Sequence, residues 1–198
     1  MAVPPPSPPL RADPDRDALR RALRARRRAF VRDAGPTGLA AMHRDLVLRL
    51  IPHLTGARIV AAYVAAGSEI DPLGILLHAA GLGLRTALPR VESRQEPMSF
   101  RYWQQGEELV TGPMDLIQPN ADAGVCEPDL ILAPLLGFDR SMGRIGQGGG
   151  FYDRAFVAHP HARRIGLAWS AQEVDALPLE PWDVPLHGIA TEREWIER

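Results

Sequence analysis

Hydrophobic residues near the start of the chain recur at steps close to three and four, which is the spacing of one helix face. Two amphipathic helices are therefore predicted, over residues 15–32 and 37–51, with Pro52 as the stop signal of the second. The first is rich in arginine, and its arginines could form a solvated face or a binding surface. The apolar positions that define the two helices are Leu19, Leu23, Phe30, Leu39, Met42, Leu46 and Leu50.

Further along the chain, short apolar runs replace this spacing and predict buried strands. Helical stretches at 72–80 and 152–158 separate some of these runs, and such alternation is typical of a sheet covered by helices. We predict an α/β fold with an open, mainly parallel sheet, helices on both faces, three layers and a single domain. The sheet would be mixed if residues 98–108 begin a hairpin. The predicted strands are residues 58–64, 84–88, 98–103, 130–133, 164–169 and 188–191.

Residues 1–14 differ from the rest of the chain because they hold six prolines, which remove backbone donors and favour extended conformations. We expect a flexible proline-rich arm here and one folded domain over residues 15–198. With 198 residues, of which 45% are hydrophobic, the chain is long enough to bury one core. Its apolar runs fall far short of the roughly 20 residues that a membrane-spanning helix needs.

The charge balance argues against nucleic acid or a membrane as partner. The chain has 23 basic and 24 acidic residues, whereas proteins dedicated to such partners usually carry a basic excess. All 23 basic residues are arginine, so a Schiff-base or Walker-type lysine is excluded. The lone Cys126 cannot form an internal disulfide, and the first residues lack a signal-peptide pattern. We expect a cytoplasmic monomer that acts on small molecules.

The strongest chemical signal is a glycine-rich loop between a predicted strand and a predicted helix. Five glycines fall within the eight positions from Gly143 to Gly150. Glycine lets the backbone approach a ligand closely, and the free amides of a helix start attract phosphate. The order of the glycines matches neither the Walker loop nor the dinucleotide fingerprint. The loop predicts a phosphate site with Arg144 and Arg154 as neighbouring cations, and a tight turn chosen for packing is the alternative.

Acidic residues near the predicted site are candidate ligands. Asp153 directly follows the loop and would repel phosphate unless a cation lay between them, so it is either a magnesium ligand or a first-turn acid that favours the helix dipole. Asp183 lies on a proline-flanked loop and is either a second ligand or a turn residue. Glu69 follows the strand at 58–64, where a carboxylate can recognise a polar ligand edge, whereas Asp71 is better explained as a helix cap.

Several other reactive or aromatic residues are expected to be structural. His159 and His161 lie two apart but lack a third metal ligand in a suitable pattern, and Cys126 has no evident activating partner. Aromatic residues at strand positions could stack on a flat ring, but they more often belong to the core. The aromatic residues in question are Tyr63, Trp103, Tyr152 and Trp169.

The run from Gly143 to Arg154, preceded by Leu136-Gly-Phe-Asp139, resembles the signature of the 5-formyltetrahydrofolate cyclo-ligase family, also called methenyltetrahydrofolate synthetase. The resemblance implies ATP- and magnesium-dependent conversion of 5-formyltetrahydrofolate to 5,10-methenyltetrahydrofolate through a phosphorylated formyl group, with release of ADP and phosphate. Further similar segments follow in order along nearly the whole chain: Leu19-Arg20, Glu69, Leu88-Pro89-Arg90, Met98-Ser-Phe100, Pro128-Asp129, Trp182-Asp183 and Ile189-Ala-Thr-Glu192.

The resemblance also implies roles for individual residues. Those implied for ATP are Arg16, Arg20, Arg144, Ile145, Gly146, Gln147, Gly148, Gly149, Gly150, Phe151 and Tyr152. Those implied for the folate are Val64, Glu69, Gln147, Gly148, Gly149, Gly150 and Phe151. Magnesium is assigned to Asp153 and Asp183, and catalysis to Arg144, Tyr152 and Asp153.

The chain departs from the family pattern at three positions. The family usually has lysine where Arg16 stands, often histidine where Trp182 stands and often an acid where His187 stands. Arginine keeps the charge of lysine but changes its geometry. Two other functions stay open: another phosphate-handling α/β enzyme, and a module that binds nucleotide or folate without turnover.

Overall fold

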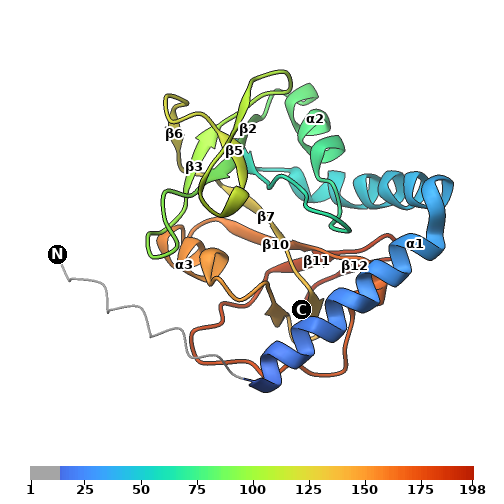
Figure 1. The fold of residues 1–198 in the computed structure, drawn as a ribbon. Coiled ribbons are helices and arrows are strands. Elements are labelled where there is room, and N and C mark those ends of the chain that lie inside the picture. Colours follow the sequence, from blue (N-terminus) through green and yellow to red (C-terminus); the bar gives the residue numbers. More distant parts are fainter. Residues whose placement is uncertain (1–13) are drawn as a thin grey trace.

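An eight-stranded mixed sheet forms the centre of the fold (Figure 1). The computed structural model describes residues 14–198, so the predicted arm lies outside the described residues except for Pro14, at which the first helix begins. The helices are α1 (Pro14–Leu50), α2 (Leu73–Gly81) and α3 (Phe151–Ala158), with short 3-10 turns at Ile51–Leu54, Pro113–Asp115 and Ser170–Gln172. The strands are β1 (Ile59–Ala61), β2 (Arg85–Arg90), β3 (Ser99–Tyr102), β4 (Leu109–Thr111), β5 (Ile117–Pro119), β6 (Val125–Cys126), β7 (Leu130–Pro134), β8 (Gly137–Phe138), β9 (Arg144–Ile145), β10 (Arg163–Leu167), β11 (Gly188–Ala190) and β12 (Trp195–Ile196).

The strand order of the large sheet is β12-β11-β10-β7-β1-β2-β3-β6. The central strands from β11 to β2 pair in parallel. The strands outside them, β12 on one side and β3 and β6 on the other, pair antiparallel. The predicted mainly parallel sheet is therefore confirmed, and it is mixed because β3 runs antiparallel to β2. Separate two-stranded ribbons are formed by β4 with β5 and by β8 with β9.

The two helices predicted at the start of the chain are two halves of α1 joined by a bend. Gly35 has φ 63° and ψ 173°, which is not helical, and Pro36 follows it. A positive φ is accessible to glycine at little cost, and proline cannot donate the backbone hydrogen bond that would continue a straight helix. The two halves of α1 diverge from this bend (Figure 1).

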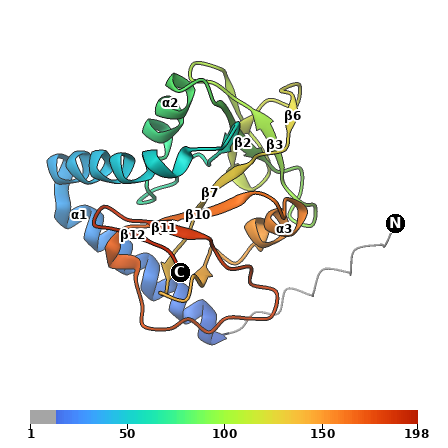
Figure 2. The same cartoon turned by 180° about the vertical axis from the view of Figure 1, so that it is seen from behind.

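Alternate residues of the central strands face two separate hydrophobic clusters. On one face, Leu130 and Leu132 pack with residues from α2 and the second half of α1. On the other face, Ile131 and Ala133 pack with Phe156 of α3. Figure 2 shows the helices on both sides of the sheet, so the predicted three layers are confirmed.

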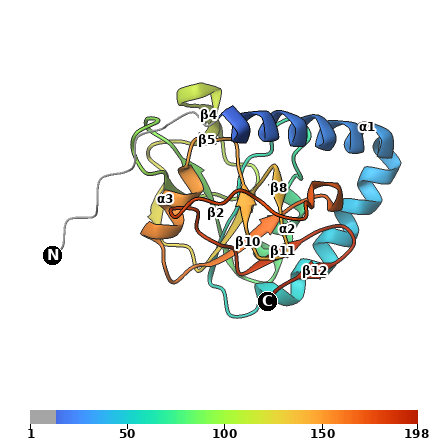
Figure 3. The same cartoon turned by 90° about the horizontal axis from the view of Figure 1, so that it is seen from below.

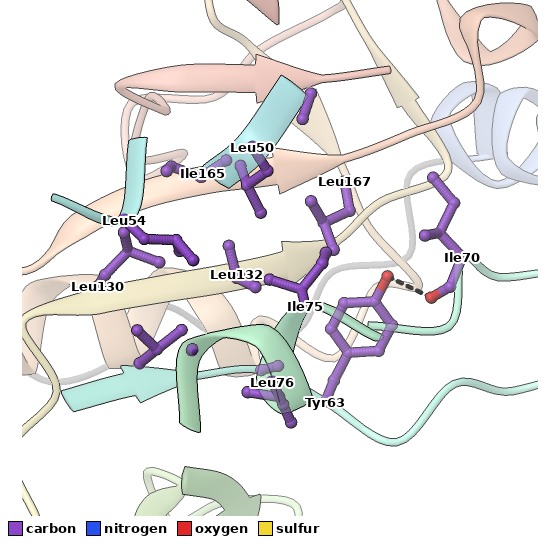
Figure 4. Packing of buried hydrophobic residues seen from close by; sticks show 14 of the residues in the cluster. Leu50, Leu54, Tyr63, Ile70, Ile75, Leu76, Leu130, Leu132, Ile165 and Leu167 are labelled. Atoms are coloured by element: carbon purple, nitrogen blue, oxygen red, sulfur yellow. Dashed lines mark hydrogen bonds between the residues drawn. The ribbon is translucent and has the colours of Figure 1, made fainter. Parts of the chain in front are cut away.

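Three of the four aromatic residues expected in the core are buried there. Tyr63, Trp103 and Trp169 are buried in the cluster beneath α1 and α2. The Tyr63 hydroxyl donates a 2.8 Å hydrogen bond to the Ile70 carbonyl, which satisfies its polar atom inside the core (Figure 4).

The first half of α1 lies beside the loops that follow the parallel strands, apart from the second half that covers the sheet (Figure 3). Leu23 of this half packs against Leu136 and Ile145 in a third cluster. A Cβ atom at Gly137 would lie 2.7 Å from a methyl carbon of Leu23, so a side chain at this position would force Leu23 to move. No helix within residues 14–198 is both long and apolar enough to cross a membrane.

Leu132→Ala tests the core that supports these loops. Leu132 has 0% exposure in the central strand β7, so its truncation should lower the free energy of unfolding by about 2–5 kcal/mol. Leu48, at 59% exposure on α1, provides the matched control, and Leu48→Ala should change the free energy by no more than about 0.5 kcal/mol. Urea unfolding measures both changes, and equal losses in the two variants would contradict the layer assignment.

Candidate functional site

Three segments that lie far apart in the sequence meet at the carboxyl ends of the parallel strands. They are the first half of α1, the loop after β1 up to Glu69, and the segment after β7 that includes the glycine loop. Arg20 Nε donates to the Gly146 carbonyl at 3.2 Å, and Gln147 Nε2 lies 3.4 Å from Glu69 Oε1. Ligands of open α/β sheets bind at this end of the strands.

The glycine loop occupies residues 146–150, between β9 and α3. Gly148 and Gly150 have φ values of 97° and 63°, and Gly150 caps the start of α3. Side chains rarely adopt this left-handed backbone conformation, so these glycines are needed for the path of the loop. The amides at the beginning of α3 then lie beside the loop, as the predicted phosphate site requires.

The arginines of α1 divide into a face that contacts the site and a face in solvent. Arg16 Nη2 donates to Asp183 Oδ2 at 2.9 Å, and Arg24 Nη2 donates to Gln147 Oε1 at 2.6 Å. With Arg20 they follow one helix face at four-residue steps. The solvated alternative holds for the other face, which carries exposed arginines at Arg21, Arg26, Arg28 and Arg32.

The two predicted metal ligands lie on neighbouring segments, and each is paired with an arginine. Asp153 Oδ1 accepts hydrogen bonds from Arg144 Nη2 at 2.6 Å and from the Val184 amide at 3.3 Å. Asp183 Oδ2 accepts from Arg16, as described above, and from the Glu180 amide at 2.8 Å. The Val184 contact places Asp153 next to the loop that carries Asp183.

These two carboxylates fit a magnesium site. They do not form a complete set of protein ligands such as other metals require. Carboxylate oxygens are hard ligands, and magnesium is usually held by one or two carboxylates together with substrate phosphates and water. Within the described residues, no three histidine, cysteine, aspartate or glutamate side chains gather to form a complete metal site. A magnesium ion bound by Asp153 and Asp183 would therefore take its other ligands from phosphate and water.

Three buried polar atoms beside the glycine loop have no hydrogen-bond partner among residues 14–198: the Tyr152 hydroxyl, Arg144 Nε and Arg154 Nε. Burial raises the pKa of Tyr152 well above its usual value, and the charge of Glu69 acts in the same direction. The hydroxyl is therefore protonated at neutral pH and is a donor. A buried polar group without a partner costs about 1–3 kcal/mol, which is relieved if a ligand supplies the partner.

Glu69 faces the glycine loop, whereas Asp71 does not take part in the site. Glu69 Oε2 accepts a 3.1 Å hydrogen bond from the Ala66 amide, which holds the carboxylate over its own loop. Half-buried Val64 lies on the same segment and packs against the core. Asp71 Oδ1 accepts from the Leu73 amide at 2.9 Å, so its predicted role as a helix cap is confirmed.

Some of the residues implied by the family resemblance support the site without facing a ligand. Ile145 is 1% exposed and packs against Leu23, so its side chain anchors the strand before the glycine loop. Half-buried Phe151 lies under the Arg154 guanidinium, whose carbon is 5.0 Å from the ring centroid. His187 Nδ1 accepts from the Arg164 amide at 2.9 Å and so ties the residue before β11 to the neighbouring strand β10.

Sequence reasoning missed Arg24 and Arg27. Arg24 contacts Gln147, and Arg27 is 4% exposed beneath the loop that carries Glu69. The available signal was the spacing of Arg16, Arg20, Arg24 and Arg27, which lie three or four residues apart along one helix face. The pattern is hard to recognise because the same helix carries further arginines on its solvent-exposed face.

A cavity of about 510 Å³ lies at the opposite end of the strands and contains none of the predicted residues. Arg58, Arg85, Tyr102 and Cys126 are among its lining residues, at or near the amino ends of β1 and β2. Burial raises the pKa of Cys126 to about 11, so the thiol is protonated at neutral pH. The convergence of the predicted side chains marks the site at the carboxyl end.

Comparison with known proteins identifies relatives along almost the whole chain. Residues 12–192 match the model of the 5-formyltetrahydrofolate cyclo-ligase family. The 5-formyltetrahydrofolate cyclo-ligase of Escherichia coli (strain K12) is 30% identical over 179 residues, which cover 85% of this chain and 96% of that protein. The Mycolicibacterium smegmatis cyclo-ligase is 32% identical over 148 residues, covering 70% of this chain and 76% of that protein.

Solved structures share the fold. The 5,10-methenyltetrahydrofolate synthetase of Aquifex aeolicus superposes with a TM-score of 0.77 at 22% identity, covering 92% of each chain. The corresponding enzyme of Mycoplasma pneumoniae gives a TM-score of 0.69 at 24% identity, covering 89% of this chain and 98% of that chain. These likenesses agree with the predicted α/β class.

Asp139 holds the turn before the glycine loop and should make the stability of the protein depend on pH. Its Oδ1 accepts from the Ser141 and Gly143 amides, and its Oδ2 accepts from the Leu177 amide. Burial by itself would raise the pKa of this carboxyl, but the hydrogen bonds from Ser141, Leu177 and Gly143 outweigh burial and hold the pKa below its ordinary value. The resulting stability is present above the unfolded pKa and is lost as pH falls through the folded pKa.

Asp139→Asn should lower the free energy of unfolding by about 1–3 kcal/mol at pH 7, because the amide accepts fewer hydrogen bonds. The difference in the free energy of unfolding between wild type and variant should become smaller as pH falls below about 4, because the wild-type carboxyl then also becomes protonated. Urea unfolding between pH 7 and pH 3 measures this difference, and exposed Asp122→Asn is the control. A difference that stayed constant with pH would refute the assigned role.

Proposed function

This chain belongs to the 5-formyltetrahydrofolate cyclo-ligase family, and we propose that its glycine-loop site converts 5-formyltetrahydrofolate to 5,10-methenyltetrahydrofolate with cleavage of ATP to ADP and phosphate. The supporting observation is the convergence of the glycine loop, the α1 arginines and two carboxylates at one end of the sheet. A phosphate cradle, cations and metal ligands in one place are the parts that phosphoryl transfer requires.

The reaction needs ATP because a formamide oxygen is a poor leaving group. In the proposed reaction, the formyl oxygen attacks the γ-phosphorus, the bond from that phosphorus to the bridging oxygen breaks, and ADP leaves. The neighbouring folate nitrogen N10 then attacks the activated formyl carbon and loses its proton. The carbon–oxygen bond breaks, phosphate leaves with the former formyl oxygen, and the five-membered ring is closed.

Catalysis of this kind depends mostly on positioning and on neutralising charge. The amides of residues 146–150 would hold the phosphates, since the left-handed glycines turn the backbone around them. Arg144, Arg16 and Arg20 would supply positive charge around the same group. Arginine presents several donors in a fixed plane, so it can bind two phosphate oxygens at once where a lysine offers a point charge.

We assign a magnesium ion to Asp153 and Asp183 in the complex with ATP. When bound, it would neutralise phosphate charge and orient the γ-phosphoryl group for in-line attack. Asp153 pairs with Arg144 and Asp183 pairs with Arg16. The two arginines could bind phosphate while the carboxylates hold the metal.

The folate would lie between Glu69 and the glycine loop. Glu69 can accept hydrogen bonds from the N–H groups on the polar edge of the pterin ring, and half-buried Val64 can contact the ring itself. The Tyr152 hydroxyl, a buried donor without a partner, can donate to the formyl oxygen or to the phosphoryl group as charge develops there.

The two alternative functions, another phosphate-handling enzyme and a non-catalytic binding module, can be distinguished from a cyclo-ligase by their ligand requirements and by turnover. A sugar-phosphate or coenzyme A enzyme on the same fold would not require magnesium and ATP together. A binding module would take up nucleotide or folate without forming product. Turnover in the presence of both ligands therefore distinguishes the cyclo-ligase from both alternatives.

Purified protein mixed with 5-formyltetrahydrofolate and Mg-ATP should produce the absorbance of the methenyl product, and omission of ATP or chelation of magnesium should abolish it. Asp153→Ala should lower kcat by about 10²-fold or more, since it removes a carboxylate that would hold the magnesium ion beside the phosphoryl group. Exposed Asp122→Ala should keep kcat within about twofold. A folded wild type that binds ATP but forms no product would overturn the proposal.

Tyr152→Phe should separate a ligand-directed hydroxyl from a structural one. Loss of the donor should lower kcat by about 10²-fold. The free energy of unfolding of the ligand-free protein should stay the same or rise by about 1 kcal/mol, because a buried hydroxyl without a partner is removed. Product formation and urea unfolding give the two readouts, and an unchanged kcat would rule out this role for the hydroxyl.

A further inference from the structure

Arg27 is a buried cation that the reaction outlined above does not use. It lies in the middle of the first half of α1, and its side chain is 5% exposed. Its Nε donates to Ser68 Oγ at 3.0 Å, and its Nη1 donates to the Leu135 carbonyl at 3.3 Å. The same Nη1 lies 3.5 Å from Glu69 Oε1. One side chain thus joins α1, the loop after β1 and the end of β7.

The position is an unfavourable one for a positive charge. Burial lowers the pKa of the Arg27 guanidinium, although the neighbouring Glu69 carboxylate acts in the opposite direction. Replacing a buried ionic group by an apolar side chain of similar volume is often neutral or stabilising. Packing alone therefore does not account for an arginine here, and its polar contacts must do so.

Those contacts hold the Glu69 carboxylate together with contacts from its own loop and from the glycine loop. Glu69 Oε2 is fixed by the Ala66 amide, while Oε1 lies between Arg27 and Gln147. The backbone of the preceding residue is also fixed, because the Ser68 carbonyl accepts from Trp169 Nε1 at 3.2 Å. Of all these partners, Arg27 alone contacts both the Ser68 side chain and the Glu69 carboxylate.

We propose that Arg27 is a positioning residue for the folate: by holding Ser68 and Glu69 from beneath, it aims the Glu69 carboxylate at the N–H donors of the pterin edge. This proposal rests on the proposed function, in which Glu69 binds the folate. Arg27 acts through Glu69 and touches neither the folate nor ATP. Its hydrogen bonds go to residues 68, 69 and 135 and none goes to the glycine loop, so its effect is selective for the folate.

Arg27→Gln should raise KM for 5-formyltetrahydrofolate at least tenfold and leave kcat and KM for ATP within about threefold. Arg27→Lys should lie between wild type and Arg27→Gln, because one ammonium group cannot reach all three acceptors. Arg28→Gln is the matched control: it removes the same charge from the adjacent, exposed position of the helix and should keep all three constants within twofold.

A double-mutant cycle separates positioning of Glu69 from a general structural effect. Glu69→Gln should itself raise KM for the folate at least tenfold. Adding Arg27→Gln to it should then raise that KM by less than twofold, since the carboxylate that Arg27 positions is already gone. A structural role would give the full effect of Arg27→Gln in both backgrounds and would also raise KM for ATP.

Ser68→Ala keeps the proposal testable if Arg27→Gln fails to fold, which circular dichroism would reveal. It removes only the hydroxyl that Arg27 Nε binds, and it should raise KM for the folate about threefold without changing KM for ATP. The proposal is overturned by additive effects in the cycle, by equal effects on both substrates, or by unchanged constants in Arg27→Lys and Ser68→Ala.

Failure of the proposed function would look different from failure of this inference. It would appear in the wild type, as a folded protein without ATP-dependent product. If that wild type still bound 5-formyltetrahydrofolate, the same comparison of variants on its dissociation constant would test Arg27. A wild type that bound no folate would overturn both proposals together.

Discussion

The bend at Gly35 is the constraint on which the rest of the structure depends, because it lets one helix serve both the core and the site. A straight helix of the 37 residues in α1 would extend about 55 Å and would pass well beyond the sheet. With the bend, Leu46 and Leu50 cover the sheet while the first half lies along the strand ends. Only the direction that Gly35 imposes brings the arginines of the first half to the glycine loop.

Charge pairing is the second feature that organises the site. Arg16 pairs with Asp183, and Arg144 pairs with Asp153, with little exposure of either arginine. A buried charge without a partner is costly, so each aspartate supplies the partner that its buried arginine needs. In the proposed reaction, Asp153 and Asp183 would hold magnesium, and the two arginines would pair with the phosphates instead.

Much of the fold could be predicted from local patterns. The strands at β1, β2, β3, β7, β10 and β11 and the helices α2 and α3 lie where apolar runs and helical spacing placed them. The pairs β4 with β5 and β8 with β9 were missed, since so few residues carry no periodic signal of their own. The equally short β1 was found because it lies in the longer apolar run of residues 59–66. The order of the strands in the sheet could likewise not be predicted from the sequence.

The sequence by itself indicated the α/β class, the glycine loop and the candidate carboxylates, because these follow from spacing and local chemistry, and it indicated the family through the resemblance of residues 143–154 to a known signature. Tertiary structure alone decided that Asp153 lies beside the Asp183 loop, that Tyr152 is a buried donor, and which arginines of α1 reach the site. Arg27 shows the reason. Its neighbours Arg26 and Arg28 have the same chemistry, yet helix geometry turns them into solvent and turns Arg27 toward residues 41 to 108 positions away.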